Sequence, residues 1–179
     1  MVAALGCPNL PMRDDAASPV GVIFTAVRGQ GAKVEPLACE EPAVPIHVND
    51  TTDPSAARFC ESVEAGHSSH SDAAAVAGHL GVAAEPYRID SQCKYAVVAR
   101  GSADIYLRLP TRADYVERIW DHAAGALVVS EAGGRVTDIH GVPLDFACGR
   151  GLDRNRGVVA SNGLLHDALL SAIAHLGLR

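Results

Sequence analysis

Strand-type and helix-type segments alternate from residue 59 to the end of the chain, and this alternation constrains the fold more than any other feature. Residues 59–63 have the composition of a short strand, and residues 71–80 are alanine-rich with the Ser-Asp start that favours helix entry. The succession continues to an amphipathic segment at 165–176. Such alternation is typical of α/β layering, so the sequence predicts a layered mixed sheet flanked by helices.

The clearest predicted helix is the segment DHAAGALVVSEAGG, which follows Trp120. Asp121 is placed to cap it, the body is apolar, and Gly133 and Gly134 end it. A second helix is predicted from Asp90 to residue 99. The remaining expected strands are 104–109, 135–137 and 157–160.

The N-terminal third has a different pattern. Residues 20–34, VGVIFTAVRGQGAKV, place β-branched and apolar residues on both sides of a Gly-Gln-Gly turn, which predicts a hairpin. Residues 35–54 are rich in proline and acids, which predicts a loop with one short strand at 46–48. We therefore expect two units, residues 1–54 and residues 55–179.

The charge balance excludes some classes of partner. A net charge of -6 argues against a protein that holds long nucleic acid by its phosphates, but it leaves room for a small anionic ligand. The longest charge-free apolar run of the second half is far shorter than the roughly 20 residues that span a bilayer. No membrane association is expected.

Cysteine spacing bears on the compartment. The five cysteines are widely scattered and show no CxxC or CxxH pairing, which favours reduced thiols over disulfides or zinc and predicts a cytoplasmic protein. They are Cys7, Cys39, Cys60, Cys93 and Cys148.

Asp121 is the sharpest single candidate for chemistry. A carboxylate on the first turn of a helix can ligate a divalent cation while the helix N-terminus offers amides to a phosphate. Aspartate is also a good N-cap, and the residue taken alone favours capping.

Other candidate side chains suit an anion. Ser91 and Lys94 stand three apart at a predicted helix start, which sets a hydroxyl and an ammonium on one face, although an N-cap and a solvated lysine would look the same. Arg108 interrupts an apolar strand and needs either a partner or solvent. His67, in the loop GHSSH, could hydrogen-bond an anion or belong to a surface turn.

Taken together, these motifs resemble one family. The order GHSSH, DSQCKY, ADIYLRLP, IWDHAAG with EAGG, PLDF and GVVASNG resembles the C-terminal half of 3′(2′),5′-bisphosphate nucleotidases, which belong to the inositol-monophosphatase-like superfamily. The segments LGCPNLP and IFTAVRGQGA resemble the middle of those enzymes, so the resemblance covers essentially the whole chain. WDHAAG with EAGG is shared more widely, whereas the first three motifs narrow the resemblance to the bisphosphate nucleotidases.

The resemblance implies hydrolysis of adenosine 3′,5′-bisphosphate to AMP and phosphate, in sulfur assimilation, with Mg²⁺ as the cofactor. By motif position, Asp121 would be a metal ligand beside the scissile phosphate. The residues that would contact the nucleotide are His67, Ser91, Lys94, Arg108 and Asp121. The fold implied is the C-terminal domain of the superfamily, preceded by remnant strands of the N-terminal domain.

The family's glutamate pair and its Asp-Pro-Ile/Leu-Asp-Gly-Thr segment have no counterpart in this sequence, so no catalytic residue is assigned. We therefore expect a truncated half that is inactive alone. A non-catalytic adenine-nucleotide or partner-binding module and an inositol phosphate phosphatase are the alternatives. A hairpin without its neighbouring sheet would leave an exposed apolar face, which predicts association with another chain.

Overall fold

The computed structural model describes residues 1–14, 18–38, 41–63, 69–110, 112 and 114–178. The N-terminal strands form an antiparallel sheet in the order β1-β2-β3-β4. The strands are β1 (Val2–Pro11), β2 (Val20–Val27), β3 (Ala32–Pro36) and β4 (Val44–Ile46). β2 and β3 are the predicted hairpin, and its turn uses Gly29 and Gly31 at φ of 78° and 82°, which glycine adopts without a steric penalty.

The prediction that this hairpin lacks a neighbouring sheet is wrong. β2 pairs with β1 from Val2↔Val27 to Cys7↔Val22, and β3 pairs with β4, so both hairpin strands lie inside the sheet. The sequence pattern did not reveal β1 because Pro8 and Pro11 interrupt it, and the register does shift between Cys7 and Pro11. An edge strand tolerates proline, since one side of it needs no ladder hydrogen bonds.

The second sheet is mixed, with strand order β6-β5-β7-β9-β8. Its strands are β5 (Phe59–Glu61), β6 (Tyr87–Arg88), β7 (Ile105–Arg108), β8 (Arg135–Thr137) and β9 (Val158–Ser161). β5 runs parallel to β6 and β7, whereas β9 is antiparallel to β7 and β8. The mixed sheet that the alternation predicted is therefore present.

Within the part of the chain that the structure describes, four helices divide between the two faces of this second sheet. Along β7, Ile105 and Leu107 face one hydrophobic cluster while Tyr106 faces the other, as the two-residue period of a strand requires. The first cluster packs against α1 (His70–His79) and α4 (His166–His175), and the second against α2 (Cys93–Ala99) and α3 (Ala123–Glu131).

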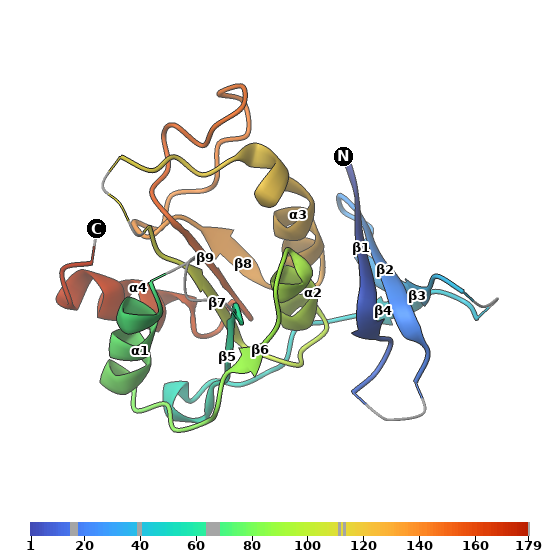
Figure 1. Cartoon of the computed structure of the whole chain (residues 1–179), viewed down its shortest axis with the longest axis horizontal. Helices are drawn as coiled ribbons and strands as arrows, with labels where there is room; N and C mark the ends of the chain where they lie inside the picture. Colours follow the sequence, from blue (N-terminus) through green and yellow to red (C-terminus); the bar gives the residue numbers. More distant parts are fainter. Residues whose placement is uncertain (15–17, 39–40, 64–68, 111, 113, 179) are drawn as a thin grey trace.

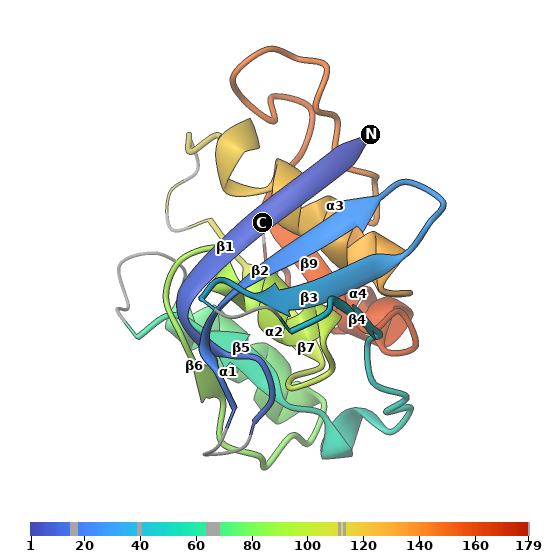
Figure 2. The ribbon, with the colours of Figure 1, turned by 90° about the vertical axis from the view of Figure 1, so that its right-hand side faces the viewer.

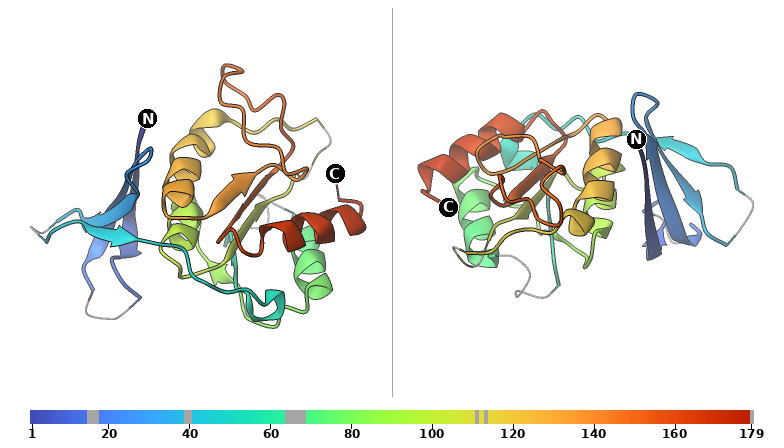
Figure 3. Two further views of the ribbon diagram at one scale, coloured as in Figure 1. Left: turned by 180° about the vertical axis from the view of Figure 1, so that it is seen from behind. Right: turned by 90° about the horizontal axis from the view of Figure 1, so that it is seen from above.

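The layers can be followed in Figures 1 and 3. α2 and α3 lie between the two sheets, and α1 and α4 cover the far side of the second sheet. Figure 2 shows the strands of the first sheet crossing over α2 and α3. Buried residues of the first sheet, such as Phe24 and Val34, share one apolar cluster with Val97 and Val128 of these helices.

Several local predictions need correction. β6 was not predicted, because two residues carry no periodic signal. The short strand expected at 46–48 lies earlier, as β4. Asp121 does not cap α3: it ends a 3₁₀ turn, η3 (Ile119–Asp121), and the residue before α3 is His122, whose side chain makes no capping hydrogen bond.

Among the described residues, no helix has the length and apolar character needed to cross a bilayer. A further 3₁₀ turn, η1 (Pro54–Ala56), lies between the two sheets in sequence. The proposed division of the chain after residue 54 falls at this turn, and it remains a proposal.

Candidate functional site

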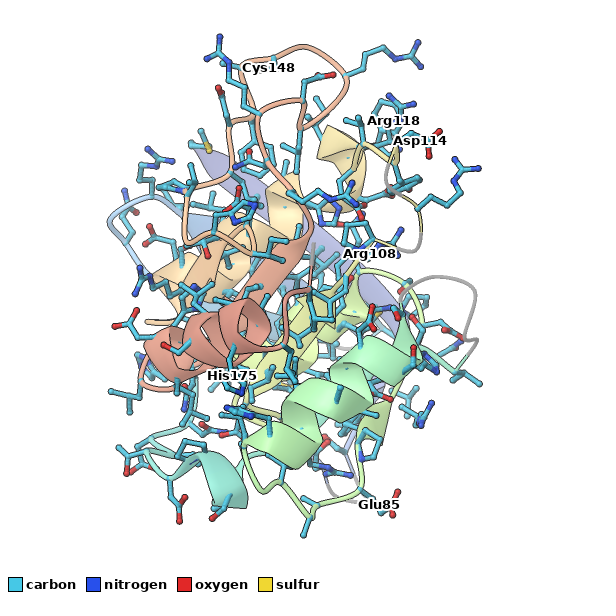
Figure 4. The ribbon with its side chains drawn as sticks, turned by 90° about the vertical axis from the view of Figure 1, so that its left-hand side faces the viewer. Glu85, Arg108, Asp114, Arg118, Cys148 and His175 are labelled. Carbon is cyan, nitrogen blue, oxygen red and sulfur yellow. The ribbon has the colours of Figure 1, made fainter. Side chains whose placement is uncertain are left out.

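A cavity of about 490 Å³ opens where β1, the segment before α2, β7 and η3 meet. Four of the five predicted site residues line it, namely Ser91, Lys94, Arg108 and Asp121; Arg108 is labelled in Figure 4. The fifth, His67, lies outside the described residues. The rest of the lining is Leu5, Gly6, Gln92, Tyr106 and His122.

The segment before α2 is held in an unusual conformation. Ser91 has a φ of 63°, the only positive value for a non-glycine residue within the described part of the chain, and such backbone strain persists only where the surroundings enforce it. Asp90 Oδ1 accepts a hydrogen bond from the Val63 amide at 3.0 Å, and Gln92 Nε2 donates to the Trp120 carbonyl at 2.8 Å. These two bonds fix Ser91 at the cavity wall.

Lys94 brings a buried positive charge to the cavity. Its side chain is only 4% exposed, Nζ donates to Ser62 Oγ at 3.0 Å, and the ammonium lies 5.4 Å from the centroid of the Tyr106 ring. Burial lowers the pKa of Lys94 because it disfavours the charged form. An ammonium carries three donors, so donors beyond the one given to Ser62 remain for a ligand.

Arg108 belongs to a chain of hydrogen-bonded side chains behind the cavity. Its Nε bonds to Glu117 Oε1 at 3.1 Å, Glu117 Oε2 bonds to His122 Nε2 at 2.9 Å, and His122 Nδ1 lies 2.7 Å from the Tyr95 hydroxyl. Glu117, His122 and Tyr95 are all buried. These hydrogen bonds therefore fix the Arg108 guanidinium at the cavity and connect it to α2 through Tyr95.

Within this row of hydrogen-bonded side chains, the charges of Arg108 and Glu117 compensate each other. Burial acts to raise the pKa of Glu117, but the hydrogen bond from His122 and the charge of Arg108 outweigh it and lower that pKa. Glu117 is thus a carboxylate and accepts a hydrogen bond from His122 Nε2, while the other ring nitrogen, Nδ1, shares a hydrogen bond with the Tyr95 hydroxyl. The sequence did not single out Glu117, Tyr95 or His122, because nothing in their spacing indicates that they meet.

Asp121 offers a carboxylate that no described residue engages. It is half-buried at the end of η3, and no hydrogen bond or ion pair to its side chain exists within the described chain. Among the described residues that line the cavity it is the only carboxylate, and both oxygens of Glu117, behind the cavity, bond to other side chains. Asp121 can therefore accept a hydrogen bond from a ligand or contribute one metal ligand.

The donor set does not fit a magnesium site of its own. Mg²⁺ requires about six oxygen ligands in a tight octahedron, usually one or two carboxylates with waters and phosphates. Across the residues with a described placement, no group of three His, Cys, Asp or Glu side chains is arranged to hold a metal ion, and Lys94 and Arg108 place two cations near Asp121.

Known proteins resemble the chain over nearly its full length. A model of the inositol monophosphatase family matches residues 1–177. The 3′(2′),5′-bisphosphate nucleotidase of Emericella nidulans is 48% identical, with 96% of this chain and 53% of the relative covered. The protein of the same name from Schizosaccharomyces pombe is 46% identical, with 97% and 50% covered.

Solved structures share the fold. The inositol monophosphatase from Anabaena superposes with a TM-score of 0.59 at 26% identity, covering 88% of this chain and 62% of that one. SuhB from Mycobacterium tuberculosis gives a TM-score of 0.62 at 21% identity, covering 96% and 63%. The chain spans about half the length of the curated relatives it matches.

Proposed function

Because the chain belongs to the inositol monophosphatase family, we propose that its cavity binds adenosine 3′,5′-bisphosphate as the nucleotide-holding half of a 3′(2′),5′-bisphosphate nucleotidase. The observation that carries the proposal is the convergence of Ser91, Lys94 and Arg108 on one cavity. These residues lie in two separate motifs, DSQCKY and ADIYLRLP, that resemble that enzyme.

The electrostatics of the cavity support an anionic ligand. The chain as a whole has a net charge of -6, yet two cationic side chains meet at this cavity, so the positive field is local to it. Lys94 and Ser91 supply donors on one wall, and Arg108 supplies a fixed guanidinium on another. A planar guanidinium suits phosphate oxygens, and a compact ammonium suits them as a point charge.

Asp121 takes a different part in the proposal. A carboxylate beside a phosphate is repelled unless a proton or a cation lies between them. We assign Asp121 the role of accepting a hydrogen bond from a hydroxyl group of the ligand. The proposed binding therefore does not depend on magnesium. Binding by the described residues is accordingly expected to change little when the metal is added.

Hydrolysis of the bound nucleotide requires more groups than the described cavity lining supplies. Hydrolysis of a phosphate monoester needs a positioned water and charge stabilisation on the transferred phosphoryl group. The described lining supplies the cationic groups, but Asp121 is its only carboxylate. This favours a second candidate function as well, a nucleotide-binding module without turnover.

A phosphate-release assay separates the two functions. The purified chain is incubated with adenosine 3′,5′-bisphosphate and Mg²⁺, alone and with the separately produced part of the Schizosaccharomyces pombe relative that this chain does not match. Release only in the mixture supports the nucleotidase. Nucleotide binding without release in either case supports the binding module, and displacement of the nucleotide by inositol monophosphate would assign the cavity to inositol phosphates.

A further inference from the structure

Two histidine rings meet at the C-terminal ends of α1 and α4. His79 is the last residue of α1, and His175, labelled in Figure 4, is the last residue of α4. Their ring centroids lie 4.7 Å apart, with an angle of 31° between the ring planes. Both helices cover the face of the second sheet opposite to α2 and α3, and neither contributes to the cavity lining, so the pair is separate from the nucleotide cavity.

The spacing of the two rings is set by the packing of the helices that carry them. Val76 of α1 and Ile173 of α4 are buried in the same apolar cluster. Leu80 and Leu178, just beyond the two helices, pack against that cluster. Because this packing holds both backbones in place, the imidazoles are brought together before any ligand arrives, which lowers the entropy cost of binding one.

The nitrogens of both rings are available to a ligand. His79 and His175 are exposed, and among the residues that the structure describes no hydrogen bond or ion pair engages either imidazole. Their position favours a cation in particular. The last carbonyl groups of a helix have no partner within it and give its C-terminal end a partial negative charge, and here two such ends lie together.

The ring spacing matches that of two imidazoles bound to one metal ion. A metal–nitrogen distance of about 2.0–2.1 Å places the ring centroids of two neighbouring imidazole ligands roughly 4.5–5 Å apart. The observed separation of 4.7 Å lies within this range. The torsion that turns a histidine ring has broad energy minima, so one nitrogen of each ring can turn toward a shared ion without any movement of the helices.

We propose that His79 and His175 form a two-imidazole site for a late first-row transition ion, of the class of Ni²⁺, Cu²⁺ and Zn²⁺, which joins the ends of α1 and α4. Imidazole nitrogen suits these ions, whereas Mg²⁺ prefers oxygen ligands. No third His, Cys, Asp or Glu side chain of the described residues completes the site, so water fills the remaining positions. The site is independent of the proposed nucleotide binding.

Calorimetric titration with Ni²⁺ tests the site without any nucleotide. The full chain, purified without a histidine tag, is titrated in its folded state, with and without an excess of Mg²⁺. We expect one Ni²⁺ per chain, bound equally well in excess Mg²⁺, and tighter binding when Cu²⁺ replaces Ni²⁺. Because the folded chain presents two adjacent imidazoles and the unfolded chain does not, Ni²⁺ should also raise the unfolding temperature of the wild-type chain.

Two variants and a matched control identify the ligands. Loss of a group that merely supports a metal ligand costs about 10–100-fold in affinity, so His79→Ala and His175→Ala, which each remove a ligand, should weaken Ni²⁺ binding at least about tenfold. The double variant should bind no more weakly than either single one, because a lone imidazole holds the ion poorly. His140→Ala, which removes another exposed histidine, should bind as the wild type does.

The side chains of His79 and His175 are exposed, so all variants should fold, and thermal unfolding without metal checks that they do. Several results would overturn the proposal. These are no Ni²⁺ binding by the folded wild-type chain, unchanged affinity in His79→Ala or His175→Ala, and an equal loss of affinity in His140→Ala. Displacement of Ni²⁺ by Mg²⁺ would also overturn it, because an oxygen-rich site would then hold the ion.

Discussion

The buried side chains behind the cavity decide its chemistry at the scale of single residues. Glu117 compensates the charge of Arg108 and orients His122, which in turn holds the Tyr95 hydroxyl. A buried ion pair adds little net stability over an apolar pair, but removal of one partner leaves an uncompensated charge. The network therefore positions Arg108 at the cavity, and its members are sensitive to substitution.

Glu117→Gln should lower the free energy of unfolding by about 3 kcal/mol, because Arg108 is left without its buried counter-charge. Urea unfolding measures the change. Glu61→Gln is the matched control: Glu61 pairs with Arg88, whose side chain is 48% exposed, and exposed pairs contribute at most about 1 kcal/mol. Equal losses in the two variants would show that burial of the Arg108 pair has no special importance.

Lys94→Gln should weaken nucleotide binding at least about tenfold, since a hydrogen bond to a charged group contributes about 1.5–3 kcal/mol. Lys33→Gln, on the exposed side of β3, is the matched control and should bind as the wild type does. Affinity should also decline at alkaline pH before an ordinary lysine would lose its proton, because burial lowers the pKa of Lys94. Unchanged affinity in Lys94→Gln would remove this residue from the site.

At the scale of elements, the contact between α2 and α3 holds two walls of the cavity together. Tyr95 of α2 lies against Gly125 of α3, where an added Cβ would come within 2.3 Å of the ring. Tyr95 also makes an edge-to-face contact with Tyr106 of β7, with centroids 5.0 Å apart. The absence of a side chain at Gly125 is what allows the helices to approach this closely.

Gly125→Ala should therefore destabilise the fold by about 1–3 kcal/mol through overpacking, even though alanine favours helix. Gly78→Ala in α1 is the control, because nothing lies within 4 Å of its added Cβ, and it should stabilise by up to about 1 kcal/mol. Thermal or urea unfolding compares the two. A stabilising Gly125→Ala would contradict the close packing of Tyr95.

His166 should make stability depend on pH at the start of α4. Both of its ring nitrogens bond to hydroxyls, of Thr137 at 2.8 Å and Ser161 at 2.9 Å, and burial, then Arg135, lowers its pKa from 6.5 to about 4. Between those pH values the unfolded chain binds the extra proton, so stability falls as pH drops from about 6.5 toward 4, by up to about 1.4 kcal/mol per pH unit.

Unfolding free energies at pH 7 and pH 5 check this expectation. The difference between the two pH values should shrink in His166→Gln and stay as in the wild type in His140→Gln, because His140 is exposed. An undiminished pH dependence in His166→Gln would assign the effect to other groups.

The sequence predicted the helices and strands whose apolar residues recur with a clear periodicity, and it missed those without such a pattern. The hairpin, the four helices and most strands of the second sheet follow from apolar spacing and glycine stops, whereas β1 contains two prolines and β6 has only two residues. Asp121 looked like a helix cap, but it is the last residue of a 3₁₀ turn, and His122 lies between it and α3. The local sequence does not distinguish an aspartate that caps a helix directly from one that ends a 3₁₀ turn before the helix.

The candidate site was predictable only in part. Ser91, Lys94, Arg108 and Asp121 lie in recognisable motifs, and the fold does bring them to one cavity. The contacts of Glu117 with Arg108 and His122 depend on tertiary packing between segments that no spacing rule connects. Gln92 was missed for the same reason.

At the scale of the whole molecule, the chain is a stack of two sheets with α2 and α3 between them (Figure 1). The cavity draws residues from both sheets, since Leu5 and Gly6 belong to β1 and Arg108 to β7. If the two proposed units separate, the cavity loses one wall. Nucleotide affinity therefore depends on the stack as a whole.

The most direct test of the central claim is calorimetric titration of the purified, folded chain with adenosine 3′,5′-bisphosphate, in the presence and absence of Mg²⁺. We predict saturable binding to one site, changed less than about threefold by the metal, because the described lining holds cationic groups and only one free carboxylate. No binding to the folded chain, or binding that appears only with Mg²⁺, would contradict the account of the cavity.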